Sequence, residues 1–131
     1  MRATILIVDD DADHARMVQT TLESSRYQTA VATDGIAALE QIKTSVPDLM
    51  ILDIAMPELD GWQVLQQLRG NAATAHLPVI LLTAKTEADD IAMSWHTGAD
   101  LYLKKPFSAP ALLSFVERLL GDPRPHSARR N

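Results

Sequence analysis

Short apolar runs that stop abruptly at polar or turn-forming residues recur along the chain. The runs occupy residues 4–8, 27–32, 48–53, 77–82 and 100–103. Continuous β-branched and aliphatic runs, such as the first one, are typical of strands that are covered on both faces of a parallel sheet. Turn residues follow directly; Pro57 and Asp60-Gly61, for example, end the third run. We therefore expect five interior strands.

Between these runs, apolar residues repeat at the three- to four-residue spacing of amphipathic helices. The predicted helices cover residues 11–23, 35–46, 62–69, 87–97 and 109–120. Their core-facing positions are predicted to be Ala15, Val18 and Leu22; Ile36, Leu39 and Ile42; Val64, Leu65 and Leu68; Ala88, Ile91 and Ala92; and Leu112, Leu113, Val116, Leu119 and Leu120. Trp95 lies on the same stripe as Ala88, Ile91 and Ala92, and both a core position and an exposed surface position stay open for it. Strands that alternate with helices indicate an α/β fold, in which right-handed crossovers place helices on both faces of a parallel sheet.

The size and composition of the chain fit one domain with a substantial core. It has 131 residues, 47% of them hydrophobic, and we expect residues 2–120 to fold and the Pro- and Arg-rich residues 121–131 to form a tail or the start of a linker. The absence of cysteine excludes disulfides and thiolate metal sites. The net charge of −5 makes direct binding to nucleic acid unfavourable. No signal peptide or membrane span is recognisable, so a cytoplasmic location is expected.

Two common kinds of site are not indicated. The five glycines stand apart, so neither type of glycine-rich phosphate loop is present. The four histidines do not pair at metal-ligand spacing, and we expect them to lie on the surface. They are His14, His76, His96 and His126.

Three adjacent aspartates, residues 9–11, follow the first predicted strand. Carboxylates crowded together repel one another unless a cation relieves them. One of these residues, or Asp13, is expected to cap the following helix, and a cap needs only one side chain. Metal binding by the remaining carboxylates is the alternative interpretation, and both stay open on this stretch alone.

A coherent polar set emerges when all the strand ends are considered together. Carboxyl ends of parallel strands share one edge of the sheet, which is where open α/β sheets bind ligands. The residues delivered there are Asp9, Asp10, Asp53, Thr83 and Lys105. Aspartate oxygens suit Mg²⁺, a carboxylate can attack phosphorus, a lysine can neutralise a phosphoryl oxygen, and a threonine can donate a hydrogen bond. For Asp53, the roles of structural cap, metal ligand and nucleophile all remain possible at this point.

In this arrangement the chain resembles the receiver domain of two-component response regulators over residues 2–120. The matching motifs are Ile5-Leu-Ile-Val-Asp9-Asp10, Leu52-Asp53 with Met56-Pro57 and Asp60-Gly61, Leu82-Thr83-Ala84, Gly98-Ala99-Asp100, and Lys105-Pro106-Phe107. The resemblance implies a flavodoxin-like (CheY-like) three-layer sandwich. Its five-stranded parallel sheet would have the order 2-1-3-4-5 and would pack against five helices.

The resemblance also implies a phosphorelay function. A sensor histidine kinase or a histidine phosphotransfer protein would transfer a phosphoryl group to Asp53. Mg²⁺, or Mn²⁺ in its place, would be held by Asp10, Asp53 and the backbone carbonyl of Ala55, with Asp9 acting through water. Thr83 and Lys105 would contact the phosphoryl group, and the Lys105–Pro106 peptide is often cis in this family.

A switch is implied as well. In similar proteins the threonine moves toward the phosphoryl group and an aromatic residue of the fifth strand fills the vacated space; here these are Thr83 and Tyr102. Tyr102 read alone would be an ordinary half-buried strand aromatic. The surface expected to change comprises the fourth helix, the fifth strand and the fifth helix, and it would bind an effector or a second copy of the chain.

Two alternative functions were weighed against the phosphoacceptor function. A phosphorylation-independent docking module is disfavoured because the acceptor set is complete. A Mg²⁺-dependent aspartyl phosphatase would need a general acid two residues beyond the nucleophile, where this chain has Ala55. We therefore do not expect a turnover enzyme, although slow self-catalysed dephosphorylation is compatible with the set.

Overall fold

The computed structural model describes residues 2–56, 59–83 and 99–121, which form five strands and four helices. The strands are β1 (Thr4–Val8), β2 (Gln28–Ala32), β3 (Leu49–Asp53), β4 (Val79–Thr83) and β5 (Leu101–Lys104). The helices are α1 (Ala12–Ser24), α2 (Gly35–Thr44), α3 (Gly61–Arg69) and α5 (Ala109–Leu120). The predicted helix over residues 87–97, and Trp95 within it, lie outside the described residues.

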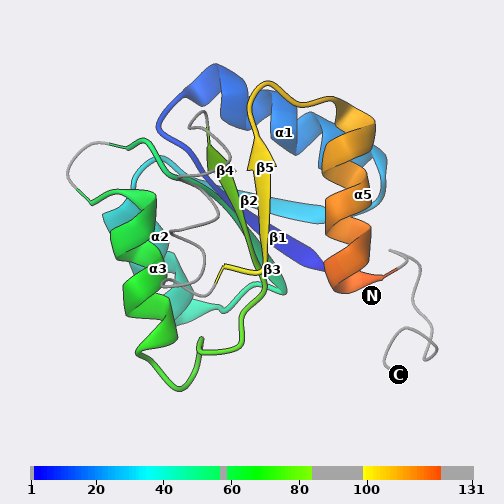
Figure 1. The fold of residues 1–131 in the computed structure, drawn as a ribbon. Coiled ribbons are helices and arrows are strands. Elements are labelled where there is room, and N and C mark those ends of the chain that lie inside the picture. Colours follow the sequence, from blue (N-terminus) through cyan, green and yellow to red (C-terminus); the bar gives the residue numbers. More distant parts are fainter. Residues whose placement is uncertain (1, 57–58, 84–98, 122–131) are drawn as a thin grey trace.

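All five strands are parallel and their order is β2-β1-β3-β4-β5, as the resemblance implied (Figure 1). The order reverses direction at β1, because the chain moves outward to β2 and then returns across β1 to β3. In such sheets the crevice beyond the carboxyl ends at this reversal is the usual ligand site. The topology therefore singles out the ends of β1 and β3.

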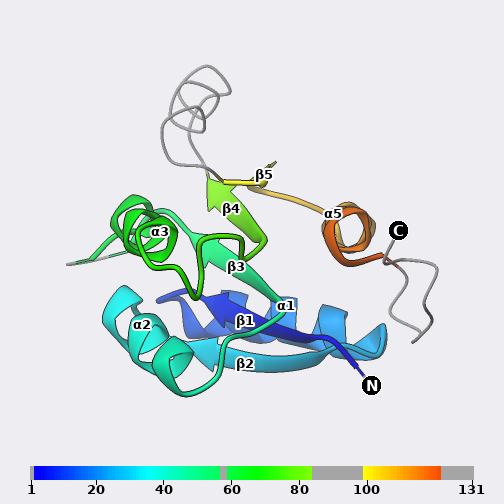
Figure 2. The ribbon, with the colours of Figure 1, turned by 90° about the horizontal axis from the view of Figure 1, so that it is seen from below.

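Side chains of the central strands alternate between two separate cores, one on each face of the sheet. One core joins the sheet to α2 and α3 through residues that include Leu6, Met50 and Leu81. The other joins it to α1 and α5 through neighbours such as Ile7, Ile51 and Ile80. The helices can be followed on the two sides in Figure 2. The unbroken apolar runs in the sequence are thus explained by a sheet that is buried on both faces.

The inward face of α2 differs from the prediction. Ile36 was expected to face the core, but its side chain is 53% exposed, and the buried positions are Gly35, Ala38 and Ile42. A β-carbon at Gly35 would lie 2.6 Å from Val64 Cγ2 and 2.7 Å from the Leu59 carbonyl oxygen. The close approach of α2 to α3 therefore selects the small residues for the inner face, which rotates Ile36 outward.

The other helical stripes agree better with the prediction. Ala15, Val18 and Leu22 are buried on α1, and Val64, Leu65 and Leu68 on α3. On α5, Leu112 and Val116 are buried, whereas Leu113, Leu119 and Leu120 are only partly covered. None of the described helices is both long and apolar enough to cross a membrane.

Polar side chains fix the helix starts. Asp11 caps α1 by accepting hydrogen bonds from the backbone N–H groups of Asp13 and His14. Asp60 and Gln63 form a reciprocal capping box at the start of α3, and Ser108 caps α5. One of the first three aspartates therefore has the structural role that was expected, and Asp9 and Asp10 remain for other chemistry.

Candidate functional site

The strand register brings the predicted residues to one edge of the sheet. Val8 pairs with Leu52, and Thr83 pairs with Lys104, so the residues that follow these pairs emerge together. A backbone hydrogen bond extends the pairing of β1 with β2 by one residue: the Asp9 N–H donates to the Ala32 carbonyl at 3.1 Å. The edge predicted from sequence is therefore formed by the ends of the strands and the residues that directly follow them.

Three carboxylates converge at this edge. One oxygen from each of Asp9, Asp10 and Asp53 lies within 4.8 Å of the other two. Asp9 is fully buried and Asp53 is 3% exposed, whereas Asp10 is exposed and makes no hydrogen bond to the rest of the described chain. The three carboxylates carry more negative charge than Lys105, which pairs with Asp53, can neutralise. Hard oxygen ligands in this number fit a divalent cation such as Mg²⁺.

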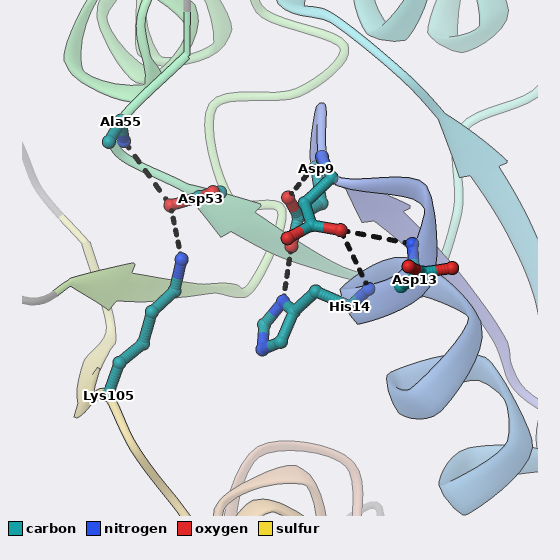
Figure 3. Close-up of polar contacts among 7 residues, drawn as sticks. Asp9, Asp13, His14, Asp53, Ala55 and Lys105 are labelled. Atoms are coloured by element: carbon teal, nitrogen blue, oxygen red, sulfur yellow. Dashed lines mark hydrogen bonds and ion pairs between the residues drawn. The ribbon is translucent and has the colours of Figure 1, made fainter.

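Two donors hold one oxygen of Asp53 (Figure 3). The Lys105 ammonium donates to Oδ1 at 3.1 Å, and the Ala55 backbone N–H donates to the same atom at 3.2 Å. Burial raises the pKa of Asp53 above its ordinary value; Lys105 opposes this shift, and the nearby Asp9 charge adds to it. Asp53 is thus an oriented carboxylate, and any further cation beside it would stabilise its ionised form.

Lys105 reaches the site from the loop that follows β5. Its backbone N–H donates to the Thr83 carbonyl at 2.7 Å, and the Lys105–Pro106 peptide is cis, as the resemblance suggested. Thr83 is 2% exposed at the end of β4. Tyr102, on β5, is partly covered, and its ring centroid lies 5.8 Å from that of Trp62 on α3. The contact between Tyr102 and Trp62 was not anticipated, because nothing in the sequence spacing brings α3 to β5.

Asp100, which was noted only as part of a motif, has a structural role. Its carboxylate accepts the Val79 backbone N–H at 2.8 Å and pairs with the Arg69 guanidinium at 3.2 Å. Arg69 also donates to the Leu77 carbonyl at 2.8 Å. These bonds join the end of α3 to the starts of β4 and β5, at the edge of the sheet opposite the acidic cluster.

The surface assignment of His14 was wrong. His14 Nδ1 contacts Asp9 Oδ2, and only 21% of its side chain is exposed. The ring also makes an edge-on contact with Phe107, with centroids 5.6 Å apart. His14 lies one helical turn beyond the acidic pair, and because it has no partner histidine, sequence spacing gave no reason to select it. Of the others, His76 is exposed as expected, and His96 and His126 lie outside the described residues.

The backbone behind Asp53 is packed against the start of α3. The Gly61 N–H donates to the Ile54 carbonyl at 3.0 Å. A β-carbon at Gly61 would lie 2.6 Å from the Asp53 carbonyl oxygen and 2.8 Å from Ile54 Cα. Only glycine allows this approach, so α3 acts as a rigid support for the acceptor strand.

The fold and this site define the class of protein: the chain belongs to the response regulator receiver domain family, whose model matches residues 5–117. It is a receiver domain of the two-component response regulator type. The match covers β2 to β5, all of β1 but its first residue, and the residues of the acidic cluster.

Known relatives and solved structures agree with this assignment. The chain is 38% identical over 120 residues to the DNA-binding response regulator MtrA of Mycobacterium tuberculosis, covering 92% of this chain and 51% of that protein. It is 38% identical over 128 residues to the response regulator MprA of Mycobacterium tuberculosis, covering 98% of this chain and 55% of that protein. The chain thus spans about half the length of these curated relatives.

Two solved structures show the same fold. The chemotaxis protein CheY4 of Vibrio cholerae matches with a TM-score of 0.87 and 30% identity, covering 92% of this chain and all of that one. The signal receiver domain of a signal transduction histidine kinase from Syntrophus aciditrophicus matches with a TM-score of 0.85 and 37% identity, covering 95% and 96% of the two chains.

Proposed function

We propose that Asp53 accepts a phosphoryl group from a phosphohistidine of a sensor kinase or a phosphotransfer protein. An Asp53 carboxylate oxygen attacks phosphorus, the bond from phosphorus to the donor nitrogen breaks, and an acyl phosphate forms. The observation that carries this proposal is the pair of donors that orients Asp53 beside two further carboxylates. Lys105 is placed to neutralise a phosphoryl oxygen, and Thr83 offers a hydroxyl.

Asp10 and Asp53, with the Ala55 carbonyl, are proposed to hold Mg²⁺, and Asp9 is proposed to act through water. A bound Mg²⁺ would reduce the repulsion between the acidic edge and an incoming phosphoryl group. Mn²⁺ is an expected substitute because it also prefers oxygen ligands. The proposal concerns a signalling acceptor with slow self-catalysed dephosphorylation, not a turnover enzyme.

We expect Mg²⁺ to stabilise the protein against unfolding and Asp10→Asn to remove most of this effect. Binding of Mg²⁺ to the folded state alone, at a concentration 100 times its dissociation constant, adds about 2.7 kcal/mol to the unfolding free energy. Asp10 is exposed and makes no hydrogen bond to another described residue, so its substitution leaves the metal-free fold intact. Urea unfolding with and without Mg²⁺ measures the difference.

Asp13→Asn is the matched control, because Asp13 is also an exposed acid near the start of α1 and loses the same charge. An equal Mg²⁺ effect in wild type and Asp10→Asn would contradict the proposed ligand.

Asp53→Asn tests the direction in which the Asp53 charge changes the stability of the metal-free protein. Because the folded-state pKa of Asp53 is raised, ionisation destabilises the metal-free fold once the pH rises through that pKa. Metal-free Asp53→Asn should therefore be the more stable protein at neutral pH, and the advantage should vanish in acid.

Thr83 and Tyr102 are proposed to form the switch. Phosphorylation adds about −1.5 to −2 charge, which attracts the Thr83 hydroxyl and frees space for the Tyr102 ring. In the unphosphorylated structure the Tyr102 ring contacts Trp62, and the proposed movement begins from this position.

In Tyr102→Ala we expect phosphorylation to proceed while the protection of amides in β5 and α5 no longer changes with it. Hydrogen exchange of phosphorylated and unphosphorylated protein measures this change, and Asp53→Asn treated with the same donor is the control. A phosphorylation-dependent change as large in Tyr102→Ala as in wild type would contradict the switch role.

The remaining assignments follow from the receiver class. We propose that residues 2–120 form the receiver, that residues 121–131 form a tail or linker, and that the protein acts in the cytoplasm. The fourth helix, β5 and α5 are the proposed surface for an effector or for dimerisation. MtrA is named a DNA-binding regulator; we propose no direct nucleic-acid contact for this receiver, whose net charge is −5.

A further inference from the structure

His14 occupies a position that the receiver function does not account for. It projects from the first turn of α1 beside the acidic edge, and its Nδ1 contacts Asp9 Oδ2 (Figure 3). It does not belong to the group of carboxylates that converge as possible metal ligands. Its direct contact with Asp9 is the route by which it can act on that group.

The Asp9 carboxylate is held at both of its oxygens. Oδ1 accepts the Asp11 backbone N–H at 2.9 Å, and Oδ2 contacts His14 Nδ1. An ionised carboxylate can only accept hydrogen bonds, so Nδ1 carries the hydrogen and donates. Together the two donors fix the rotation of the carboxylate group. Asp10, by contrast, has no hydrogen-bond partner among the described residues.

The imidazole itself is held from a second side. Its edge-on contact with Phe107, at 72° between the ring planes, comes from the loop that carries Lys105. The His14 ring therefore lies between the loop that supplies the lysine and the carboxylate of Asp9. The contact with Phe107 restricts the ring, so the ring can in turn restrict the Asp9 carboxylate.

We propose that His14 is a positioning residue that pre-orders Asp9 and thereby raises the affinity of the acidic edge for Mg²⁺. The inference rests on the proposed Mg²⁺ site. Groups that hydrogen-bond to metal-binding carboxylates change metal affinity by about 10- to 100-fold when they are removed. Asp9 is fully buried, so the His14 ring is the side chain that holds its Oδ2, and removing the ring removes that restraint.

Calorimetric titration of the folded protein with Mg²⁺ tests the proposal. His14→Leu is expected to weaken binding by about tenfold. His14→Asn should restore most of the affinity, because asparagine carries its amide nitrogen on Cγ, the atom that bears Nδ1 in histidine. Gln19→Leu is the control on the same helix: it loses a side-chain hydrogen bond to Thr29 on β2, away from the site, and should bind like wild type.

A purely structural role for His14 would reduce stability without changing the affinity of the folded protein, so circular dichroism accompanies each titration. In an Asp9→Asn background, His14→Leu should cause no further loss, because the proposed effect passes through Asp9.

Three results would overturn the proposal: equal or tighter binding by His14→Leu, failure of a folded His14→Asn to recover affinity, or a full further loss in the Asp9→Asn background. With any of these, the proposed function would stand as long as wild type binds Mg²⁺. Absence of Mg²⁺ binding by wild type would overturn both.

Discussion

Asp53→Asn is expected to abolish phosphorylation by acetyl phosphate and Mg²⁺, measured as an intact-mass shift of one phosphoryl group. The amide is a far weaker nucleophile than the carboxylate, and it also removes one of the three converging acids. The fold should survive, because an asparagine oxygen can still accept the hydrogen bonds from Lys105 and the Ala55 N–H. Loss of the adduct would therefore report chemistry rather than unfolding.

Two controls sharpen this experiment. Asp13→Asn removes an exposed acidic charge at the start of α1 and should be phosphorylated like wild type. A chelator should prevent adduct formation in wild type, because the proposed metal neutralises the acidic edge. A persistent single adduct in Asp53→Asn would move the acceptor to another residue. No adduct in wild type that binds Mg²⁺ would favour a docking module, or a receiver that accepts only from its own protein donor.

The second large effect is expected from Gly61→Ala, a substitution that lies directly behind the backbone of the acceptor residue. The new β-carbon would collide with the Asp53 carbonyl oxygen at 2.6 Å and with Ile54 Cα at 2.8 Å. Both neighbours are backbone atoms of the acceptor segment, so either that segment or α3 must move. Overpacking of this kind costs about 1–3 kcal/mol of stability. A displacement of Asp53 by about 1 Å can slow the chemistry by about 100-fold.

Gly70→Ala provides the matched control at the other end of α3. Its backbone is in the right-handed helical region, and the nearest atom to an added β-carbon would be 3.5 Å away, which is an ordinary contact. We expect Gly70→Ala to be neutral or to stabilise by about 0.4–1 kcal/mol. Urea unfolding and the rate of phosphorylation by acetyl phosphate are the two measurements. Equal behaviour of the two variants would show that α3 does not constrain the acceptor.

Much of the fold was predictable because hydrophobic period and turn chemistry are local signals. The run at Thr4–Val8 coincides with β1, and each of the other predicted strands agrees with the structure to within two residues at its ends. The predicted stripes of α1 and α3 are buried throughout. The inner face of α2 was not predictable, because the distance between α2 and α3 decides it, and the hydrophobicity of Ile36 does not report that distance.

Some residues of the candidate site were likewise predictable from the sequence, and others were not. Asp9, Asp10, Asp53, Thr83 and Lys105 were predictable, because each follows or ends a strand and parallel strands end at a common edge. His14 was not, because its contact depends on how the first turn of α1 is turned toward Asp9. The contact between Trp62 and Tyr102 likewise joins elements that are far apart in the chain.

The sequence by itself determined the succession of strands and helices and the residues at the candidate site, since these depend on periodicity and on position relative to strand ends. The class of protein followed from the motifs that resemble a known family. Only the tertiary structure decided which neighbours hold each of those residues. Packing distances between α2, α3 and the sheet, and the orientation of α1, decide whether a glycine is obligatory or a histidine reaches a carboxylate. These are non-local quantities, and no single stretch of the chain encodes them.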